Sequence, residues 1–200
     1  MTLPAWLYDL LMAPLDALGL RHYRRRLMAG LSGRVLELGA GTGRNGRHHA
    51  PATVAVDHDL AFLKRAKEQG IGSELVCADA RALPFRDGTF DRAVESLVFC
   101  SLPEPEKCLA ELARVVKSDG EIRMLDHVRA QGGWARVQHA LAPAWLAVTG
   151  DCHLDRDVKG LVEKGGLRIE RYQSRWAGWL QEVVARPPRG SSRAERVDLE

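Results

Sequence analysis

The sequence lacks long apolar segments and a strong net charge. No run of eighteen apolar residues occurs, so no membrane-spanning helix is expected. Asp9 and Asp16 interrupt the first apolar stretch where a signal peptide would be uninterrupted. The 29 Lys and Arg residues against 26 Asp and Glu leave a net charge of only +3, too little for a general binder of nucleic acid. We therefore expect a cytoplasmic protein without a nucleic-acid partner.

Paired cysteines are also missing. The four cysteines, Cys77, Cys100, Cys108 and Cys152, show none of the spacings of a zinc knuckle or a redox motif. This predicts a reducing compartment and no metal site. Hydrophobic residues at 46% and charged residues at 28% are ordinary globular values, which excludes a disordered or collagen-like chain. A length of 200 residues fits one domain with a small appendage.

Short apolar runs alternate with helical patterns from residue 33 onward. The runs are RVLELGA, TVAVDHD, ELVCADA, FDRAVESLVF, EIRMLDHV, LRIERYQ and WLQEVVARP. Alternating strands and helices are typical of a parallel sheet that is covered on both faces. We therefore predict an α/β, Rossmann-like doubly wound sheet of seven strands over residues 33–186. After the fifth run comes the helical stretch GWARVQHALAPAWLAVTG, then a helix with Asp155 as N-cap that Gly165 and Gly166 end.

The two ends of the chain differ from this pattern. Residues 1–32 predict a helical lid in which Pro14 kinks or breaks the helix. A basic cluster follows, consisting of Arg21, Arg24, Arg25 and Arg26. The lid either packs on its own domain or lies on an anionic membrane surface with Trp6 and Tyr8 at headgroup depth. Residues 187–200 are polar and predict a disordered tail, and the final VDLE resembles translated cloning sites.

The strongest local motif is VLELGAGTGRNG, in which Gly39, Gly41 and Gly43 follow a strand and are expected to open a helix. Glycines in this position allow a tight turn and a close approach of the backbone to a ligand. The spacing Gly41-x-Gly43-x-x-Gly46 also matches the dinucleotide fingerprint, so an NAD-dependent oxidoreductase is a remote alternative.

Three acids separate these alternatives. Glu37, Asp57 and Asp79 lie at the carboxyl ends of the first three predicted strands, the edge where doubly wound sheets bind ligands. They would repel a pyrophosphate. A cationic ligand with ribose hydroxyls, an amino group and an adenine amine matches them, with Asp57 on the hydroxyls, Asp79 on the adenine amine and Glu37 near the ammonium. S-adenosylmethionine is such a ligand.

With these residues the chain resembles the class I S-adenosylmethionine-dependent methyltransferases, in particular the type 11 family. The resemblance rests on ELGAGTG, VAVDHD, CADARALPF, DGTFD, SLVFCSL and LARVVKSDGEIRMLDHV, with Asp119-Gly120 where the family usually has a glycine pair. It implies an antiparallel last strand and S-adenosylmethionine as cofactor. By position it implies these cofactor contacts: Glu37, Gly39, Gly41, Gly43, Asp57, His58, Asp79, Ala80, Arg81, Glu95, Ser96 and Leu97.

Two residues near the expected reaction centre are candidate catalytic groups. Glu95, at the end of the fourth strand, could be a carboxylate that stabilises either the sulfonium or a cationic acceptor. The alternative is that it is a solvent-facing acid. His127 directly follows the fifth strand and could take a proton near neutral pH, or merely hydrogen-bond to a loop.

A narrower resemblance begins at LDHVRA and continues through the tryptophan-containing helix to GDCHLDRD. It points to bacterial phospholipid N-methyltransferases and to membrane-associated thiol methyltransferases, so a phospholipid amine or a thiol is the favoured acceptor and a quinone-like ring the alternative. Candidate acceptor contacts are Trp145, Cys152, His153 and Arg156, which could equally pack in the core or brace the lid. Nothing in the sequence indicates an oligomeric state.

Overall fold

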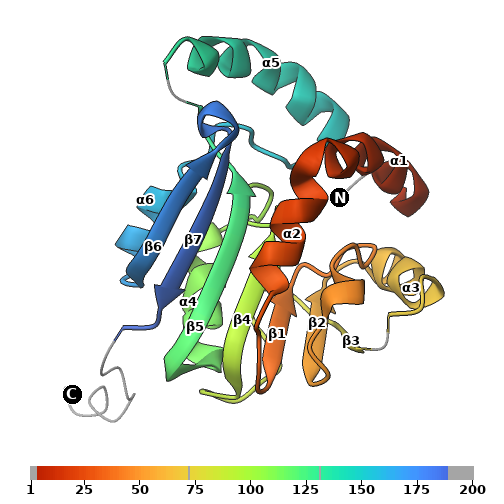
Figure 1. The fold of residues 1–200 in the computed structure, drawn as a ribbon, viewed down its shortest axis with the longest axis vertical. Coiled ribbons are helices and arrows are strands. Elements are labelled where there is room, and N and C mark those ends of the chain that lie inside the picture. The colour runs from red at the N-terminus through yellow and green to blue at the C-terminus, as the bar shows by residue number, and fades with distance from the viewer. Residues whose placement is uncertain (1–3, 72, 131, 189–200) are drawn as a thin grey trace, which may run out of the picture.

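The computed structural model describes residues 4–71, 73–130 and 132–188, so the tail predicted to be disordered lies almost wholly outside the described residues. Its centre is a seven-stranded sheet with the order β3-β2-β1-β4-β5-β7-β6 (Figure 1). The strands are β1 (Val35–Leu38), β2 (Thr53–Asp57), β3 (Glu74–Cys77), β4 (Phe90–Ser96), β5 (Val116–His127), β6 (Arg168–Arg175) and β7 (Leu180–Arg186). β7 runs antiparallel to its neighbours β5 and β6, whereas the pairs among β1 to β5 are parallel. The predicted fold class is confirmed.

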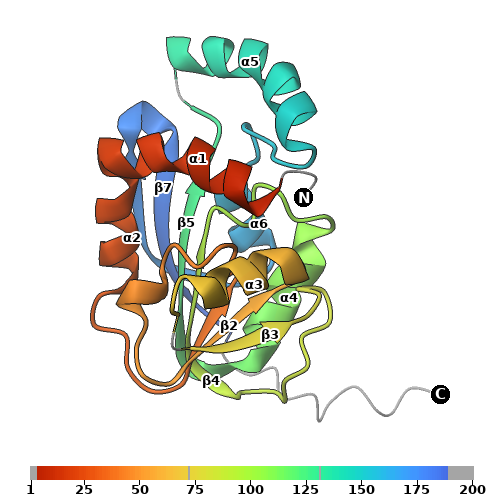
Figure 2. The ribbon, with the colours of Figure 1, turned by 90° about the vertical axis from the view of Figure 1, so that its right-hand side faces the viewer.

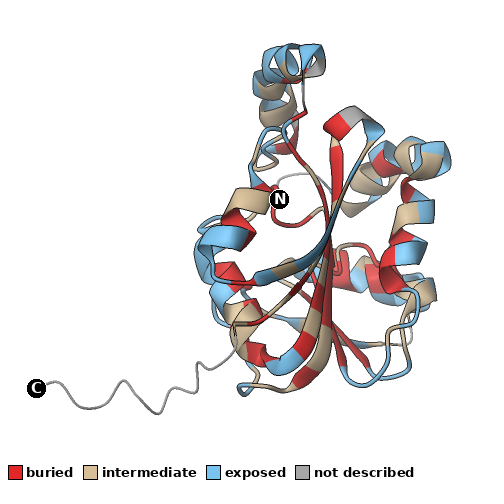
Figure 3. Ribbon diagram, turned by 60° about the vertical axis from the view of Figure 1, so that its left-hand side comes forward, coloured by how far each residue is buried: buried red, intermediate tan, exposed pale blue. Residues whose placement is uncertain are grey.

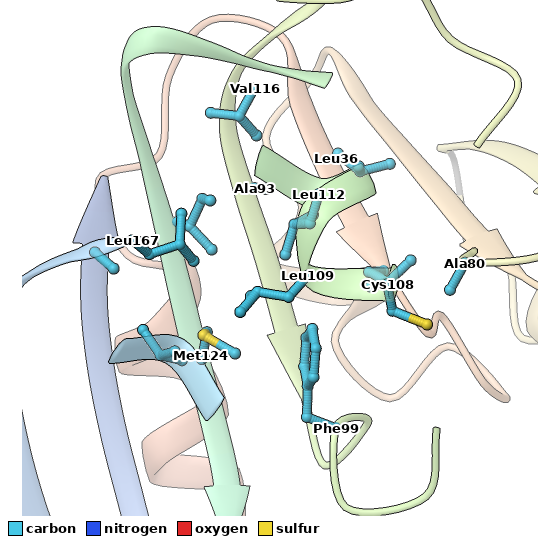
Figure 4. Packing of buried hydrophobic residues seen from close by; sticks show 14 of the residues in the cluster. Leu36, Ala80, Ala93, Phe99, Cys108, Leu109, Leu112, Val116, Met124 and Leu167 are labelled. Atoms are coloured by element: carbon cyan, nitrogen blue, oxygen red, sulfur yellow. The ribbon is translucent and has the colours of Figure 1, made fainter. Parts of the chain in front are cut away.

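The central strands β1 and β2 are almost wholly buried because helices cover both faces of the sheet. In Figure 1, α4 (Pro105–Val115) and α6 (Val158–Lys164) lie behind the sheet and α2 (Arg21–Met28) in front of it. Leu109 and Leu112 of α4 belong to the main core together with Met124 of β5 and Phe99 (Figure 4). No more than 1% of the surface of each of these residues is exposed. Burying each such side chain contributes about 1.5–3 kcal/mol. Figure 3 shows this buried layer along the sheet.

The N-terminal segment folds as α1 (Ala5–Leu15), a π-turn η1 (Asp16–Leu20) and then α2. Contrary to expectation, Pro14 lies inside α1 without ending it, and the change of direction falls at Gly19, whose φ of 127° suits glycine. Met12, Leu20 and Leu27 pack against Leu125 of β5 and Leu180 of β7. The segment is therefore attached to the sheet by its own apolar contacts.

Two further local predictions were wrong. The glycine motif does not open an α-helix, because residues 44–52 contain Gly46 and Pro51 and form only the short 3-10 turn η2 (Gly46–His48) before β2 begins. The N-cap of α6 is Asp157, which accepts from the backbone N of Gly160 at 2.9 Å, and not Asp155. Both aspartates suit an N-cap by type, so the sequence alone did not distinguish them.

The remaining helices lie around the carboxyl edge of the sheet. The side chain of Asp59 caps α3 (Leu60–Glu68), which packs beside β2 and β3. The helix α5 (Gly133–Thr149) lies beyond the carboxyl ends of the strands, at the same end of the molecule as α1 (Figures 1 and 2). The turn η3 (Trp176–Gly178) joins β6 to β7. Within the described residues, no helix has the length and apolar character needed to cross a membrane.

Candidate functional site

A cleft of about 470 Å³ opens at the carboxyl edge of the sheet, between the ends of β1, β2 and β4. From the predicted cofactor contacts it is lined by Gly39, Gly41, Asp57, His58, Asp79, Ala80, Arg81, Ser96 and Leu97. From the predicted acceptor contacts it is lined by His153 and Arg156. Glu37, Gly43, Glu95, His127, Trp145 and Cys152 are absent from this lining. The structure thus brings most of the predicted set to one hollow.

The glycine loop forms the floor of this cleft. Gly39, Gly41 and Gly43 all have positive φ values, of 71°, 56° and 85°. A Cβ on Gly39 would come within 2.3 Å of Val98 Cγ2. A Cβ on Gly43 would come within 1.8 Å of Ile71 Cδ1, so Gly43 serves the packing of the loop and does not face the cleft. The positive φ favours glycine at all three positions, and close packing also requires it at Gly39 and Gly43.

Asp57 connects the loop to β2. Its Oδ2 accepts from the backbone N of Gly41 at 2.8 Å, and its Oδ1 accepts from the backbone N of Asp59 at 2.9 Å. The exposed ring of His58 lies 3.5 Å from Asp57 Oδ1. Each carboxylate oxygen still has a lone pair for a ligand hydroxyl.

Asp79 is held by Arg81. The guanidinium Nη2 donates to Asp79 Oδ2 at 2.7 Å, and the backbone N of Arg81 donates to Oδ1 at 2.8 Å. These hydrogen bonds lower the pKa of Asp79 to about 2, so it is a carboxylate at neutral pH. Arg81 also donates to Glu104 at 2.9 Å. An adenine amine would therefore meet a carboxylate that already has a partner and a fixed orientation.

Glu37 is fully buried beneath the loop. Its Oε1 accepts from Asn45 Nδ2 at 2.7 Å, and its Oε2 lies 2.5 Å from His49 Nε2. Asn45 Nδ2 also donates to Ser96 Oγ at 2.9 Å. This position does not support the predicted contact between Glu37 and a ligand ammonium, and it gives the residue a part in holding the loop.

The N-terminal helices close one side of the cleft. Tyr8 of α1 lines it and lies against Phe62 of α3, with ring centroids 5.4 Å apart. Asp9 accepts from Thr42 Oγ1 at 2.6 Å and from Arg44 Nη1 at 2.9 Å, which ties α1 to the glycine loop. The lid therefore packs on its own domain through Tyr8.

Glu95 is paired with Asp126 of the neighbouring strand. Both side chains are 0% exposed. Burial, and next the charge of Asp126, raise the pKa of Glu95 well above its usual range, and burial also raises that of Asp126. Burial of two neighbouring carboxyl groups therefore disfavours the state in which both are charged. The solvent-facing alternative is corrected, because Glu95 is buried, and the side chain is absent from the cleft lining.

His127 lies behind the cleft wall with its Nε2 2.9 Å from Cys152 Sγ, and Cys152 Sγ is 3.9 Å from Cys100 Sγ. The hydrogen bond with Cys100 and then the imidazole lower the pKa of Cys152 to about 4. Burial lowers the pKa of His127, but the hydrogen bond and charge of Cys152 outweigh it and raise that pKa overall. The geometry favours His127 as a partner of Cys152 over a direct proton acceptor.

Arg156 braces the cleft wall. Its Nη1 donates to the backbone oxygens of Phe99 and Leu102, both at 2.7 Å. This supports the alternative that the residue holds a loop. His153 remains exposed at the cleft, and its backbone N donates to Cys100 O at 2.9 Å. Trp145, on α5, is half-buried outside the cleft lining.

Sequence reasoning missed Tyr8, Asn45 and Cys100 as parts of this region. Tyr8 and Cys100 lie far in sequence from the residues they meet, so only the fold joins them. Asn45 stands within the glycine motif, where a buried amide is a recognisable support for a loop, and that signal was present in the sequence. Leu97 was expected here, and its φ of 59° is uncommon for leucine and typical of a functional edge.

Comparison with known proteins agrees with the predicted resemblance. Residues 36–124 match the family model described as a methyltransferase domain. The fold is similar to that of an S-adenosylmethionine-dependent methyltransferase from Mesorhizobium loti. The TM-score is 0.63 at 16% identity, over 82% of this chain and 96% of that one. The family model therefore supports the predicted methyltransferase resemblance over residues 36–124, and the structural similarity supports the fold.

Two similar proteins are named for different methyl acceptors. A phosphatidylethanolamine N-methyltransferase of Cereibacter sphaeroides is 39% identical over 60% of this chain and 64% of its own length. The thiol S-methyltransferase TMT1B of Rattus norvegicus is 32% identical over 71% of this chain and 62% of its own length. The chain therefore spans less than two thirds of each of these relatives.

The residues of the cleft fit S-adenosylmethionine. The open space above Gly41, where a Cβ would meet nothing nearer than Phe62 at 4.0 Å, leaves room for a ligand against the backbone. Asp57 and Asp79 supply acceptors for hydroxyl and amine donors, and the negative charge at this edge suits a cation.

Gly39→Ala should weaken S-adenosylmethionine binding at least about tenfold, because a left-handed alanine costs about 1–2 kcal/mol and its Cβ would displace Val98. Calorimetric titration measures this. Gly70→Ala is the matched control, since Gly70 has a φ of 76° but nothing within 4 Å of its Cβ. Equal affinity of Gly39→Ala and wild type would contradict the assigned place of the loop.

Glu95→Gln should leave the ratio of S-adenosylmethionine to S-adenosylhomocysteine affinity unchanged, because Glu95 is buried outside the cleft lining and its raised pKa disfavours the charged form. Glu95→Ala should lower the free energy of unfolding by about 1–3 kcal/mol, since the buried backbone N of Val98 loses its acceptor. Calorimetry and denaturant unfolding give the two quantities. A selective loss of the sulfonium ligand in Glu95→Gln would show that the carboxylate charge is needed after all.

Proposed function

We propose that this protein transfers the methyl group of S-adenosylmethionine to a lipid-like acceptor, with a phospholipid amine as the first candidate. The observation that carries the proposal is the exposed apolar surface of α1. The same helix contributes Tyr8 to the lining of the cleft. The similarity to a phosphatidylethanolamine N-methyltransferase supports the same acceptor class.

When bound, the cofactor supplies an activated methyl group on a positively charged sulfur. The chain's own contribution is position and exclusion of water. Asp57 and Asp79 orient the ligand by two separated contacts, and Gly39 and Gly41 let it lie against the backbone. Tyr8 and Leu97 line the cleft with largely apolar surface, which favours a step in which the positive charge on sulfur is lost.

The outer face of the N-terminal segment carries exposed apolar residues. Trp6 is 63% exposed, Leu10 62% and Leu18 76%. Arg21 and Arg25 of α2 are exposed nearby. Apolar side chains beside basic ones suit the surface of an anionic membrane. We infer a peripheral contact through this face, by which a lipid would reach the cleft.

The inner face of the same segment differs from the expectation. Tyr8 lines the cleft and so is not available at headgroup depth. Arg24 is only 4% exposed and bonds to Ser96 Oγ at 2.6 Å, so it does not contribute to the basic surface. The membrane-facing set is therefore smaller than the sequence suggested.

A small thiol is the second candidate acceptor. It is favoured by the similarity to a thiol S-methyltransferase, which extends over 71% of this chain. The cleft lining carries charged groups of both signs, Asp79 and Arg156 among them, beside the exposed His153.

Release of S-adenosylhomocysteine distinguishes the acceptors. We expect turnover with phosphatidylethanolamine vesicles, and little with alkyl thiols or quinone-like rings tested at equal concentration. Asp57→Ala should abolish turnover through loss of cofactor binding, because it removes both the ligand contact and the support of Gly41. Turnover with thiols alone would replace the lipid proposal by the second candidate, and cofactor binding without any turnover on the panel would contradict both.

Sedimentation with vesicles tests the surface. Wild-type protein should sediment with anionic vesicles at low salt and much less at high salt, because basic residues near the surface contribute about 1 kcal/mol each. Trp6→Ser with Leu10→Ser should reduce sedimentation strongly, since both side chains are exposed on α1. The control Tyr172→Ser alters an exposed aromatic residue on β6 and should sediment like wild type. Equal sedimentation of all three proteins would rule out this face.

A further inference from the structure

Three metal-ligating side chains converge behind the wall of the cleft. Cys100 follows β4, His127 ends β5, and Cys152 lies between α5 and α6. Their ligand atoms all lie within 4.8 Å of one another. Cys100 is buried, and His127 and Cys152 are half-buried. The cysteine spacing predicted no metal site because the three residues come from separate segments.

The distance between the two sulfurs fits a tetrahedral ion, and the distance from the imidazole to Cys152 needs a small adjustment. Two thiolates bound to zinc at about 2.3 Å lie about 3.8 Å apart in a tetrahedron. The Cys100 and Cys152 sulfurs are 3.9 Å apart. A thiolate and an imidazole nitrogen on the same ion lie about 3.6 Å apart. His127 Nε2 and Cys152 Sγ, at 2.9 Å, would have to separate by about 0.7 Å to admit it.

The backbone around the donors is fixed by buried hydrogen bonds. Gln138, 0% exposed, donates to the backbone oxygens of Val128 at 2.7 Å and Leu154 at 2.6 Å. Val128 directly follows His127, and Leu154 is two residues after Cys152. Arg156 donates to Phe99 O, directly before Cys100. Supporting contacts of this kind hold ligand side chains in place for an ion.

The donor set also selects the ion. Two thiolates and an imidazole favour zinc or a similarly soft cation over calcium or magnesium, which prefer oxygen ligands. A disulfide would instead require the two sulfurs to approach from 3.9 Å to about 2.05 Å. The observed separation is much nearer to that of two ligands on one ion.

We propose that Cys100, His127 and Cys152 form a zinc-binding site in which the protein supplies three ligands and leaves the fourth position to water or another small ligand. The site joins the loop after β4, the end of β5 and the α5–α6 loop. Because His153, next to Cys152, lines the cleft, the ion would lie directly behind the acceptor side. The proposal rests on these donors and not on the proposed function.

Metal analysis of protein purified under reducing conditions without chelator tests the site. We expect close to one equivalent of zinc per chain, and after exchange for Co²⁺ a thiolate-to-cobalt charge-transfer band. Cys100→Ala, Cys152→Ala and His127→Ala should each bind Co²⁺ more than about tenfold more weakly, the loss that even an outer-shell change produces.

Matched controls are available in the same chain. Cys77→Ala removes an exposed cysteine and His139→Ala an exposed histidine of α5, and both should retain the band. Reduced wild-type protein that takes up neither metal would overturn the proposal, whatever the variants do. Equal loss in Cys77→Ala would overturn it as well. A Cys100–Cys152 disulfide would overturn it too. Unreduced, metal-free wild-type protein would then show two free thiols instead of four, and Cys152→Ala would show all three of its remaining thiols.

Discussion

The buried guanidinium of Arg24 is the interaction on which the arrangement of the cleft depends. A charge at 4% exposure is costly unless it is paired, and Arg24 meets Asp16 at 3.3 Å, Asn45 at 3.3 Å and Ser96 at 2.6 Å. These partners belong to the lid, the glycine loop and β4. One side chain thus fixes three segments relative to one another, and Asn45 extends the network to Glu37.

The glycine loop shows how little of its conformation comes from glycine alone. Positive φ values allow the path, but Asp57 holds Gly41 from one side and Glu37 holds Asn45 from beneath. Because residues 44–52 form no α-helix, the loop has no long helix dipole behind it. Side-chain carboxylates supply the fixed charges of this edge instead.

Much of this could be predicted from the sequence, because the signals were local. The alternation of strands and helices, the glycine motif and the acids at strand ends all depend on neighbours in the chain. Pro14 misled because a helix can continue through a proline when tertiary contacts hold it, and the two aspartates before α6 were equivalent by type. Glu95 misled because its partner, Asp126, lies on another strand. The meeting of Cys100, His127 and Cys152 was beyond local reasoning for the same reason, since only the strand order places them together.

The two faces of α1 have a thermodynamic consequence. Tyr8 points into the cleft, whereas Trp6 and Leu10 point outward from the same rigid helix. Anything that holds the outer face in one position also holds Tyr8, and a ligand that packs against Tyr8 must in turn favour that position of the outer face. Such coupling is reciprocal by necessity. Binding of a ligand in the cleft would then strengthen attachment of the molecule to a surface, and attachment would strengthen ligand binding by the same factor.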